Sequence, residues 1–122
     1  IPRADVARAS LAEALDDVGA QVTESVAYHM EVPVDAEGAT AGLLDFAPDL
    51  LVFTNAAAIR NLSALLGDAR QEQLAREAPV ASIGPVTTRV ARDGGFEVVV
   101  EPVLHDVAHL VEAICDWAGD RP

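Results

Sequence analysis

The sequence has little cysteine and few aromatic residues. Cys115 is the only cysteine among 122 residues, so no internal disulfide can form, and a reducing, cytoplasmic setting fits best. Three Phe, one Trp and one Tyr are the whole aromatic content. The core is therefore expected to be aliphatic, built from Val, Leu, Ile and Ala.

Long apolar runs and basic residues are scarce as well. No run approaches the roughly 18 residues of a membrane span, and no secretory signal pattern opens the chain. The chain starts at Ile1 rather than Met, at what we interpret as a strand end, so we expect upstream sequence. The net charge of −12 argues against non-specific nucleic-acid binding. All eight basic residues are Arg, which suits planar recognition of carboxylates.

What the chain does have is a regular alternation of short apolar runs and helical apolar spacings. Strands are expected at residues 1–4, 21–28, 50–53, 79–83 and 96–101. Helices are expected at residues 11–18, 43–46, 59–66, 86–92 and 107–114, with Gly19 and Gly67 ending the first and third. Short turns between them predict an α/β fold with a parallel, flavodoxin-like sheet, helices on both faces and right-handed crossovers. Residues 31–40 are the only candidate linker.

In such sheets, ligands bind beyond the carboxyl ends of the strands. The first informative turn there begins with Thr54 and Asn55, followed by small residues from Ala56 onward. Small residues let a ligand approach the free amides of the next helix, whose positive dipole end favours an anion. The alternative is that Thr54 or Asn55 is simply the helix N-cap.

The second informative turn contains Gly84, Pro85, Thr87 and Thr88. Gly84 allows close backbone approach, and Pro85 suits a first helical position. The two threonines place two hydroxyls in the first helical turn. Together the two turns predict a rim that binds carboxylate or phosphate, with helix capping again as the alternative.

Other polar residues carry weaker signals. His105 and His109 are four residues apart, but no third ligand is spaced to join them, so we expect no metal site. Asp106 we interpret as a helix cap, and Cys115 and Trp117 as packing residues. Because nucleotide-binding and serine-hydrolase motifs are absent, the residues by themselves indicate an anion-binding α/β domain.

Four segments, in order along nearly the whole chain, resemble the uroporphyrinogen-III synthase family. They match its stretches "PR…L…L…Ga-V…Y", "d-FTS-s-av", "IGp-TA" and "LveAl", and lie at residues 1–28, 51–59, 81–88 and 110–114. The Gly84–Thr87 element and Tyr28 are the most specific parts. Asn55 departs from the family's usual Ser, which keeps a polar group but changes its reach.

The resemblance implies an enzyme of tetrapyrrole (heme) biosynthesis that needs no cofactor. Such enzymes convert linear hydroxymethylbilane to uroporphyrinogen III by loss of the terminal hydroxyl, a spiro intermediate and ring closure with ring D inverted. The implied partner is a small-molecule polycarboxylate with eight carboxylates, and neither nucleic acid nor membrane is expected to bind.

The resemblance also implies site residues. Tyr28 matches the family's cleft tyrosine, a catalytic candidate that would assist departure of the hydroxyl. The candidate substrate-binding residues are Arg3, Thr54, Asn55, Ala56, Gly84, Pro85, Thr87 and Thr88.

The family has two α/β lobes with the active site between them, and a full synthase is about twice this length. Residues 1–32 would close one lobe, or form the first β-α-β of a single unit, and residues 33–122 would build the main flavodoxin-like lobe. A dimer of two chains that swap these parts is a further alternative. We expect the chain by itself to have little or no synthase activity.

Two other hypotheses stay open at this point. The chain could be a synthase-like ligand-sensing domain of a transcriptional regulator, or a generic phosphate-binding flavodoxin-like domain. Tyr28 and Thr87 favour the enzyme. An upstream lobe beside the gene would support the enzyme, and an adjoining winged-helix segment would support the regulator.

Overall fold

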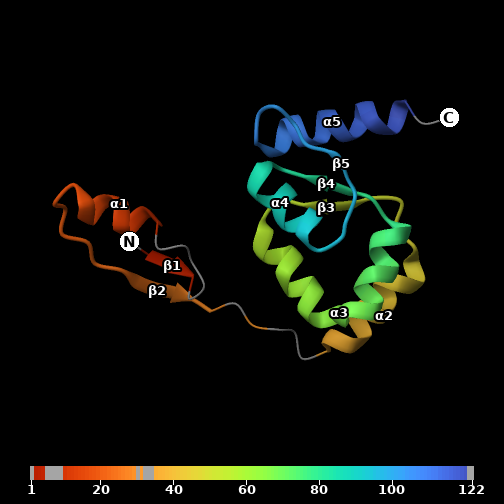
Figure 1. Ribbon diagram of the computed structural model, residues 1–122, viewed down its shortest axis with the longest axis horizontal. Coiled ribbons are helices and arrows are strands. Elements are labelled where there is room, and N and C mark those ends of the chain that lie inside the picture. The colour runs from red at the N-terminus through yellow and green to blue at the C-terminus, as the bar shows by residue number, and fades with distance from the viewer. Residues whose placement is uncertain (1, 5–9, 30, 32–34, 121–122) are drawn as a thin grey trace. The chain divides into compact units, whose positions relative to one another are not determined.

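The computed structural model describes residues 2–4, 10–29, 31 and 35–120 (Figure 1). Strands and helices alternate in the order β1 (Pro2–Ala4), α1 (Ser10–Asp17), β2 (Ser25–Tyr28), α2 (Ala36–Phe46), β3 (Leu51–Phe53), α3 (Ala56–Glu77), β4 (Val80–Ser82), α4 (Pro85–Asp93), β5 (Val98–Val100) and α5 (Val107–Gly119). The chain divides into two compact units, unit 1 (Ile1–Val34) and unit 2 (Asp35–Pro122), each described by itself below. The predicted boundary between residues 32 and 33 lies outside the described residues.

Unit 1 is a single β-α-β element. Strands β1 and β2 pair in parallel, with Ala4 opposite Tyr28. Helix α1 ends as predicted at Gly19, where the N–H of Gly19 donates to the carbonyl of Asp16 (2.8 Å) and the N–H of Ala20 to that of Leu15 (3.0 Å). Strand β2 begins later than residue 21, the start expected from the sequence.

Unit 2 contains a three-stranded parallel sheet in the order β3-β4-β5. Val80 and Ala81 are neighbours on β4, and their side chains enter two different cores because successive strand residues point to opposite faces. Val80 packs with residues of α3 and α4, and Ala81 packs with Leu110 of α5. Helices therefore cover both faces of the sheet (Figure 1), which confirms the predicted α/β class.

The core of unit 2 is largely aliphatic, as the composition predicts. Ile59, Leu74 and Val80 are almost completely buried. Phe53 and Phe96 are the aromatic exceptions, with ring centroids 6.4 Å apart. No helix in the described part of the chain is both long enough and apolar enough to cross a membrane.

Helix α2 begins seven residues earlier than the sequence pattern predicts. Asp35 caps it by accepting a hydrogen bond from the N–H of Gly38 (3.1 Å). The helix therefore occupies part of the stretch interpreted as a linker. Its start was missed because its first turns contain few large apolar residues, so the apolar spacing becomes visible only at Leu43 and Leu44.

Helix α3 continues past Gly67, where the sequence pattern predicts its end. Gly67 does leave helical geometry, with φ 68° and ψ 169°, a conformation that residues with a side chain rarely adopt. The helix resumes because its second part is held to the core: Leu74 is fully buried, and the Gln71 amide donates to the carbonyl of Gly94 (2.7 Å). Both contacts depend on packing and not on local sequence.

Candidate functional site

The carboxyl ends of β3, β4 and β5 lie at one edge of the sheet, because parallel strands point the same way. The two turns singled out in the sequence follow β3 and β4. A backbone hydrogen bond connects the starts of the two turns: the N–H of Ile83 donates to the carbonyl of Phe53 (3.0 Å). The fold therefore places the two turns side by side, as expected.

In the first turn, the capping interpretation is correct for Asn55. Its side-chain oxygen accepts a hydrogen bond from the N–H of Ala58 (2.8 Å) and so caps α3. Ala56 is buried, with 7% of its surface exposed, and its predicted role in substrate binding stays a prediction. Thr54 is exposed and remains the residue of this turn that can face a substrate.

In the second turn, no side chain caps the helix. Gly84 occupies the N-cap position of α4 and Pro85 the first turn, so the free amides there have no side-chain acceptor. Thr87 is 5% exposed, and its hydroxyl forms no hydrogen bond with another residue that the structure describes. A buried hydroxyl without a partner is uncommon and points to a ligand or water that would complete it.

Gly84 is also a point of close approach, but to a side chain of the protein. A Cβ atom placed on Gly84 would lie 3.0 Å from Cγ and 3.1 Å from Cδ2 of His105, which follows β5. The group that approaches Gly84 in the structure is the imidazole of His105, and approach of a ligand there stays a prediction. His105 is thereby fixed beside the edge of the sheet that carries both turns.

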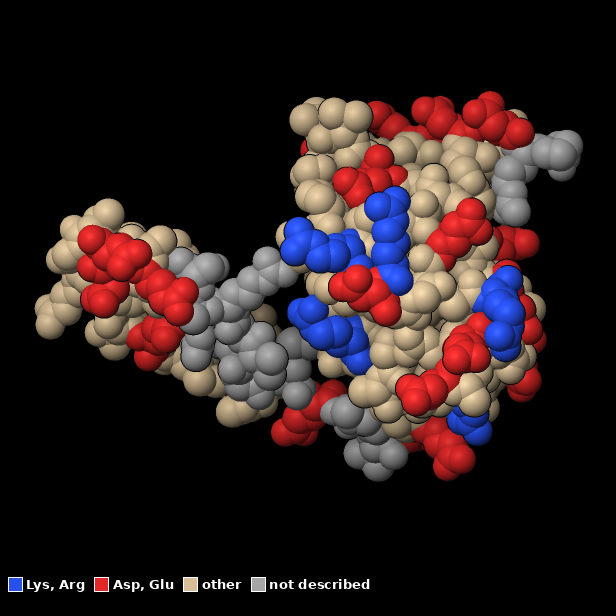
Figure 2. Space-filling model, in the orientation of Figure 1, with Lys and Arg blue, Asp and Glu red and all other residues tan. Residues whose placement is uncertain are grey.

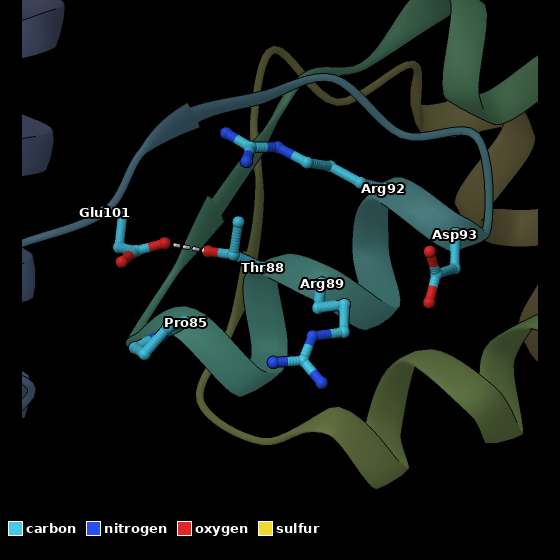
Figure 3. Close-up of a pocket in the computed structure, with 6 residues that line it drawn as sticks. All are labelled: Pro85, Thr88, Arg89, Arg92, Asp93 and Glu101. Carbon is cyan, nitrogen blue, oxygen red and sulfur yellow. Dashed lines mark hydrogen bonds between the residues drawn. The ribbon is translucent and has the colours of Figure 1, made fainter.

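A hydrogen-bonded series joins the ends of β4, α4 and β5. The Thr88 hydroxyl donates to the Glu101 carboxylate (Figure 3), and its oxygen contacts the hydroxyl of the fully buried Ser82. Because Thr88 donates its one proton to Glu101, Ser82 is the donor in its contact with Thr88, and the Gly84 carbonyl lies 3.5 Å from the Ser82 hydroxyl as a second acceptor. Thr88 is thus a buried linking residue rather than an open hydroxyl of the rim.

Sequence reasoning missed Ser82 and Glu101. Their only signal is position, since Ser82 is a polar residue inside the apolar run 79–83 and Glu101 follows the apolar run of β5 directly. Spacing could not reveal that both contact Thr88, because they are 6 and 13 residues away from it along the chain.

A hollow of about 400 Å³ opens beside this series (Figure 3). It is lined by Pro85, Thr88, Arg89, Arg92, Asp93 and Glu101. Arg92 extends toward Thr88 and Glu101, whereas Arg89 extends toward the neighbouring helix α3 (Figure 3). Charged groups of both signs therefore line the flank of α4.

Tyr28 and Arg3 lie in unit 1. Tyr28 ends β2 with 60% of its side chain exposed, and the Arg3 backbone pairs with Val26. Their predicted role beside Thr54 and Thr87 stays a prediction, because those residues belong to unit 2.

His105 and His109, the two histidines that follow β5, have separate structural roles. His105 packs on Gly84, while Nδ1 of His109 lies 2.8 Å from the carboxylate of Asp106. Asp106 caps α5, as predicted, by accepting from the N–H of His109 (2.9 Å). That backbone hydrogen bond lowers the pKa of Asp106, and the side-chain hydrogen bond to Asp106 raises the pKa of His109. Among the described residues, no group of three or more His, Cys, Asp or Glu is placed to hold a metal ion.

Comparison with known proteins identifies relatives over almost the whole chain. The family model described as "Uroporphyrinogen-III synthase HemD" matches residues 1–112. A curated protein of Methanothermobacter thermautotrophicus, named "Putative uroporphyrinogen-III synthase", is 32% identical over 125 residues. That match covers 98% of this chain and 49% of the relative, so the chain spans about half the length of the curated relative that it matches. No solved structure matches the chain.

Proposed function

The chain belongs to the uroporphyrinogen-III synthase family, and on that premise we propose that it forms part of an enzyme that cyclises hydroxymethylbilane to uroporphyrinogen III. In chemical class this enzyme is a cyclising hydro-lyase. Its substrate is a linear tetrapyrrole with eight carboxylates, and no cofactor takes part in the reaction.

The observation that carries this proposal is the state of the Thr87 hydroxyl. It is almost completely buried, has no partner among the described residues and lies in a helical turn whose amides lack a side-chain cap. Such a turn suits a carboxylate, because the free amides and the positive end of the helix dipole both favour an anion. Thr54 lies in the adjacent turn and is exposed.

We propose separate tasks for Tyr28 and for the two turns of unit 2. Departure of the terminal hydroxyl as water needs a proton, and Tyr28 is our candidate to assist that step. The substituted carbon of the last ring then attacks the methylene carbon that the hydroxyl has left, which forms the spiro intermediate. The bond from this ring carbon to the bridge toward the neighbouring ring breaks and re-forms at the other α carbon of ring D, and loss of a proton leaves ring D inverted. The turns at Thr54 and Thr87 would hold carboxylate arms of the substrate while the ring turns.

The match to half of a relative bears on what the chain can do by itself. We expect it to have little or no synthase activity unless the remaining half is supplied by further sequence, a second polypeptide or a swapped copy. A sensor role in a regulator has no observation in the described region that favours it over catalysis.

The test supplies freshly prepared hydroxymethylbilane to a protein that contains this chain and the remaining half. The ratio of the III to the I isomer is measured by chromatography after oxidation to porphyrins. The spontaneous reaction, run without protein, is the baseline. An isomer ratio no better than that baseline would refute the enzymatic proposal.

A further inference from the structure

Three of the eight arginines gather beside helices α3 and α4. Arg89 and Arg92 line the hollow along α4, and Arg60 lines a neighbouring hollow of about 390 Å³ between α3 and α4. Asp93 lines both hollows. Figure 2 shows basic side chains gathered on this face of unit 2 around acidic ones.

These three guanidinium groups are not committed to ion pairs. Arg60, Arg89 and Arg92 are exposed, and none lies within 4.0 Å of a carboxylate oxygen belonging to another described residue. Arg76, by contrast, is paired with Glu72 at 3.7 Å. Their planar donors therefore remain available for a carboxylate from outside the chain.

The side chains that line the two hollows have a net charge opposite in sign to that of the whole chain. Two carboxylates, Asp93 and Glu101, line the same hollows, and Glu101 already accepts the hydroxyl hydrogen of Thr88. Three guanidinium groups against two carboxylates leave a small positive surplus on a chain of net charge −12. An anionic ligand is repelled by most of the surface, so a positive surplus strongly determines where it approaches.

The hollow is continuous with the candidate site. It begins at Pro85 and Thr88, in the first turn of α4, and continues along the flank of that helix to Arg92 and Asp93. The hollow therefore starts in the same helical turn as the uncapped amides, and its charged groups lie along the flank of the same helix. One helix N-terminus cannot hold the many carboxylates of a linear tetrapyrrole.

We propose that Arg60, Arg89 and Arg92 form a carboxylate-binding subsite that receives arms of the substrate remote from the reacting ring. This inference rests on the proposed function for the identity of the substrate. The subsite supplies binding and orientation, and takes no part in bond making or bond breaking.

A binding experiment tests the subsite without requiring catalysis. The whole chain is titrated with benzenehexacarboxylate, and the side-chain Nε–Hε signals of its arginines are followed by NMR at low and at high salt. We expect Arg60, Arg89 and Arg92 to shift together at low salt, with Arg70, an exposed residue in the second part of α3, unaffected. No shift, or equal shifts at all arginines, would overturn the subsite.

A kinetic experiment adds the second test, in a protein with measured synthase activity. Arg60→Gln, Arg89→Gln and Arg92→Gln are each expected to raise KM by about two- to fivefold, as for exposed charge pairs, with kcat unchanged. Arg70→Gln is the matched control, because it changes the net charge equally at a site outside both hollows. If Arg70→Gln raises KM as much as the others, the subsite is refuted.

The two experiments separate the two proposals. Specific shifts at the three arginines, in a protein that forms no excess of isomer III, would support the subsite and refute the synthase activity. If the protein is an active synthase and its KM is unchanged in all three variants, the activity is supported and the subsite is refuted. Circular dichroism of each variant verifies that it is folded.

Discussion

The Thr88 hydroxyl donates a hydrogen bond to the carboxylate of Glu101, and this contact links the first turn of α4 to the end of β5. Ser82, at the end of β4, adds a second contact, because its buried hydroxyl lies against the hydroxyl of Thr88. Three elements that meet at the carboxyl edge of the sheet are thus held in register by side chains. The position of the uncapped first turn of α4 depends on this connection.

The first prediction concerns Thr88→Val, which keeps the shape of the side chain and removes its hydroxyl. Glu101 then loses its donor, and the buried Ser82 hydroxyl keeps only the Gly84 carbonyl at 3.5 Å as acceptor, so we expect the free energy of unfolding to fall by about 1–3 kcal/mol. Urea denaturation measures the change. Thr87→Val is the matched control in the same buried turn, and it should change stability little because its hydroxyl has no partner among the described residues. Equal losses in the two variants would contradict the assigned role of Thr88.

The second prediction concerns Gly84→Ala. The added methyl group would meet the ring of His105 at 3.0 Å, so we expect a loss of about 1–3 kcal/mol, as for overpacking. Adding His105→Ala should restore most of that loss, which a double-mutant cycle measures. Gly42→Ala in α2 is the control, because a Cβ there has open space and should stabilise the helix by about 0.5–1 kcal/mol.

The third prediction tests the second part of α3. Leu74→Ala should lower the free energy of unfolding by about 2–5 kcal/mol, because Leu74 is fully buried. Val111→Ala on α5 is the control, since the Val111 side chain is 53% exposed. Thermal and urea unfolding measure both variants. A loss at Leu74 no larger than at Val111 would mean that residues beyond Gly67 do not belong to the core.

The fourth prediction concerns pH. The pKa of His109 should lie above its ordinary value of about 6.5, because Asp106 accepts a hydrogen bond from its ring. Because the pKa is raised by folding, protonated His109 stabilises the fold. This stabilisation is fully present at a pH below the pKa of His109 in the unfolded chain, and it is lost as the pH rises through the pKa in the folded chain. NMR titration of the His109 ring measures it. Asp106→Asn can still cap the helix but carries no charge, and should return the pKa toward the ordinary value.

The pair of Asp106 and His109 also makes stability depend on pH in the acid range, where stability falls as the pH falls. The pKa of Asp106 is lowered, so its contribution is present above the ordinary carboxyl value and is lost as the pH falls through the lowered pKa. An unchanged titration of His109 in Asp106→Asn would show that the side-chain hydrogen bond to Asp106 does not raise the pKa of His109.

The fifth prediction concerns Tyr28→Phe in a protein with measured synthase activity. If Tyr28 assists departure of the hydroxyl, kcat should fall by about 100-fold, in the range of general acid catalysis. Stability should stay within about 0.5 kcal/mol, since the Tyr28 side chain is 60% exposed in unit 1. Unchanged turnover would remove Tyr28 from the list of catalytic candidates.

Much of the architecture of unit 2 follows from local sequence. The apolar runs at residues 50–53 and 79–83 predict the strands β3 and β4, and the helical spacings between them predict a parallel sheet covered on both faces. The middle residue of β3, Val52, is nevertheless 51% exposed. Asp106 as a cap could be predicted for the same reason, since capping involves residues only a few positions apart. Even the two turns of the candidate site could be located, because parallel topology brings them to one edge.

Tertiary structure determined which polar groups of those two turns are paired and which are free. Asn55 and Gly84 both begin helices, yet only Asn55 uses a side chain to cap its helix. The partners of Thr88 come from β4 and β5, and Arg60 reaches the flank of α4 from another helix. Such contacts join residues far apart in sequence, and packing selects them from many combinations that the local pattern allows equally. The sequence by itself determined where a ligand could approach, and the packing of unit 2 determined which groups are free to meet it.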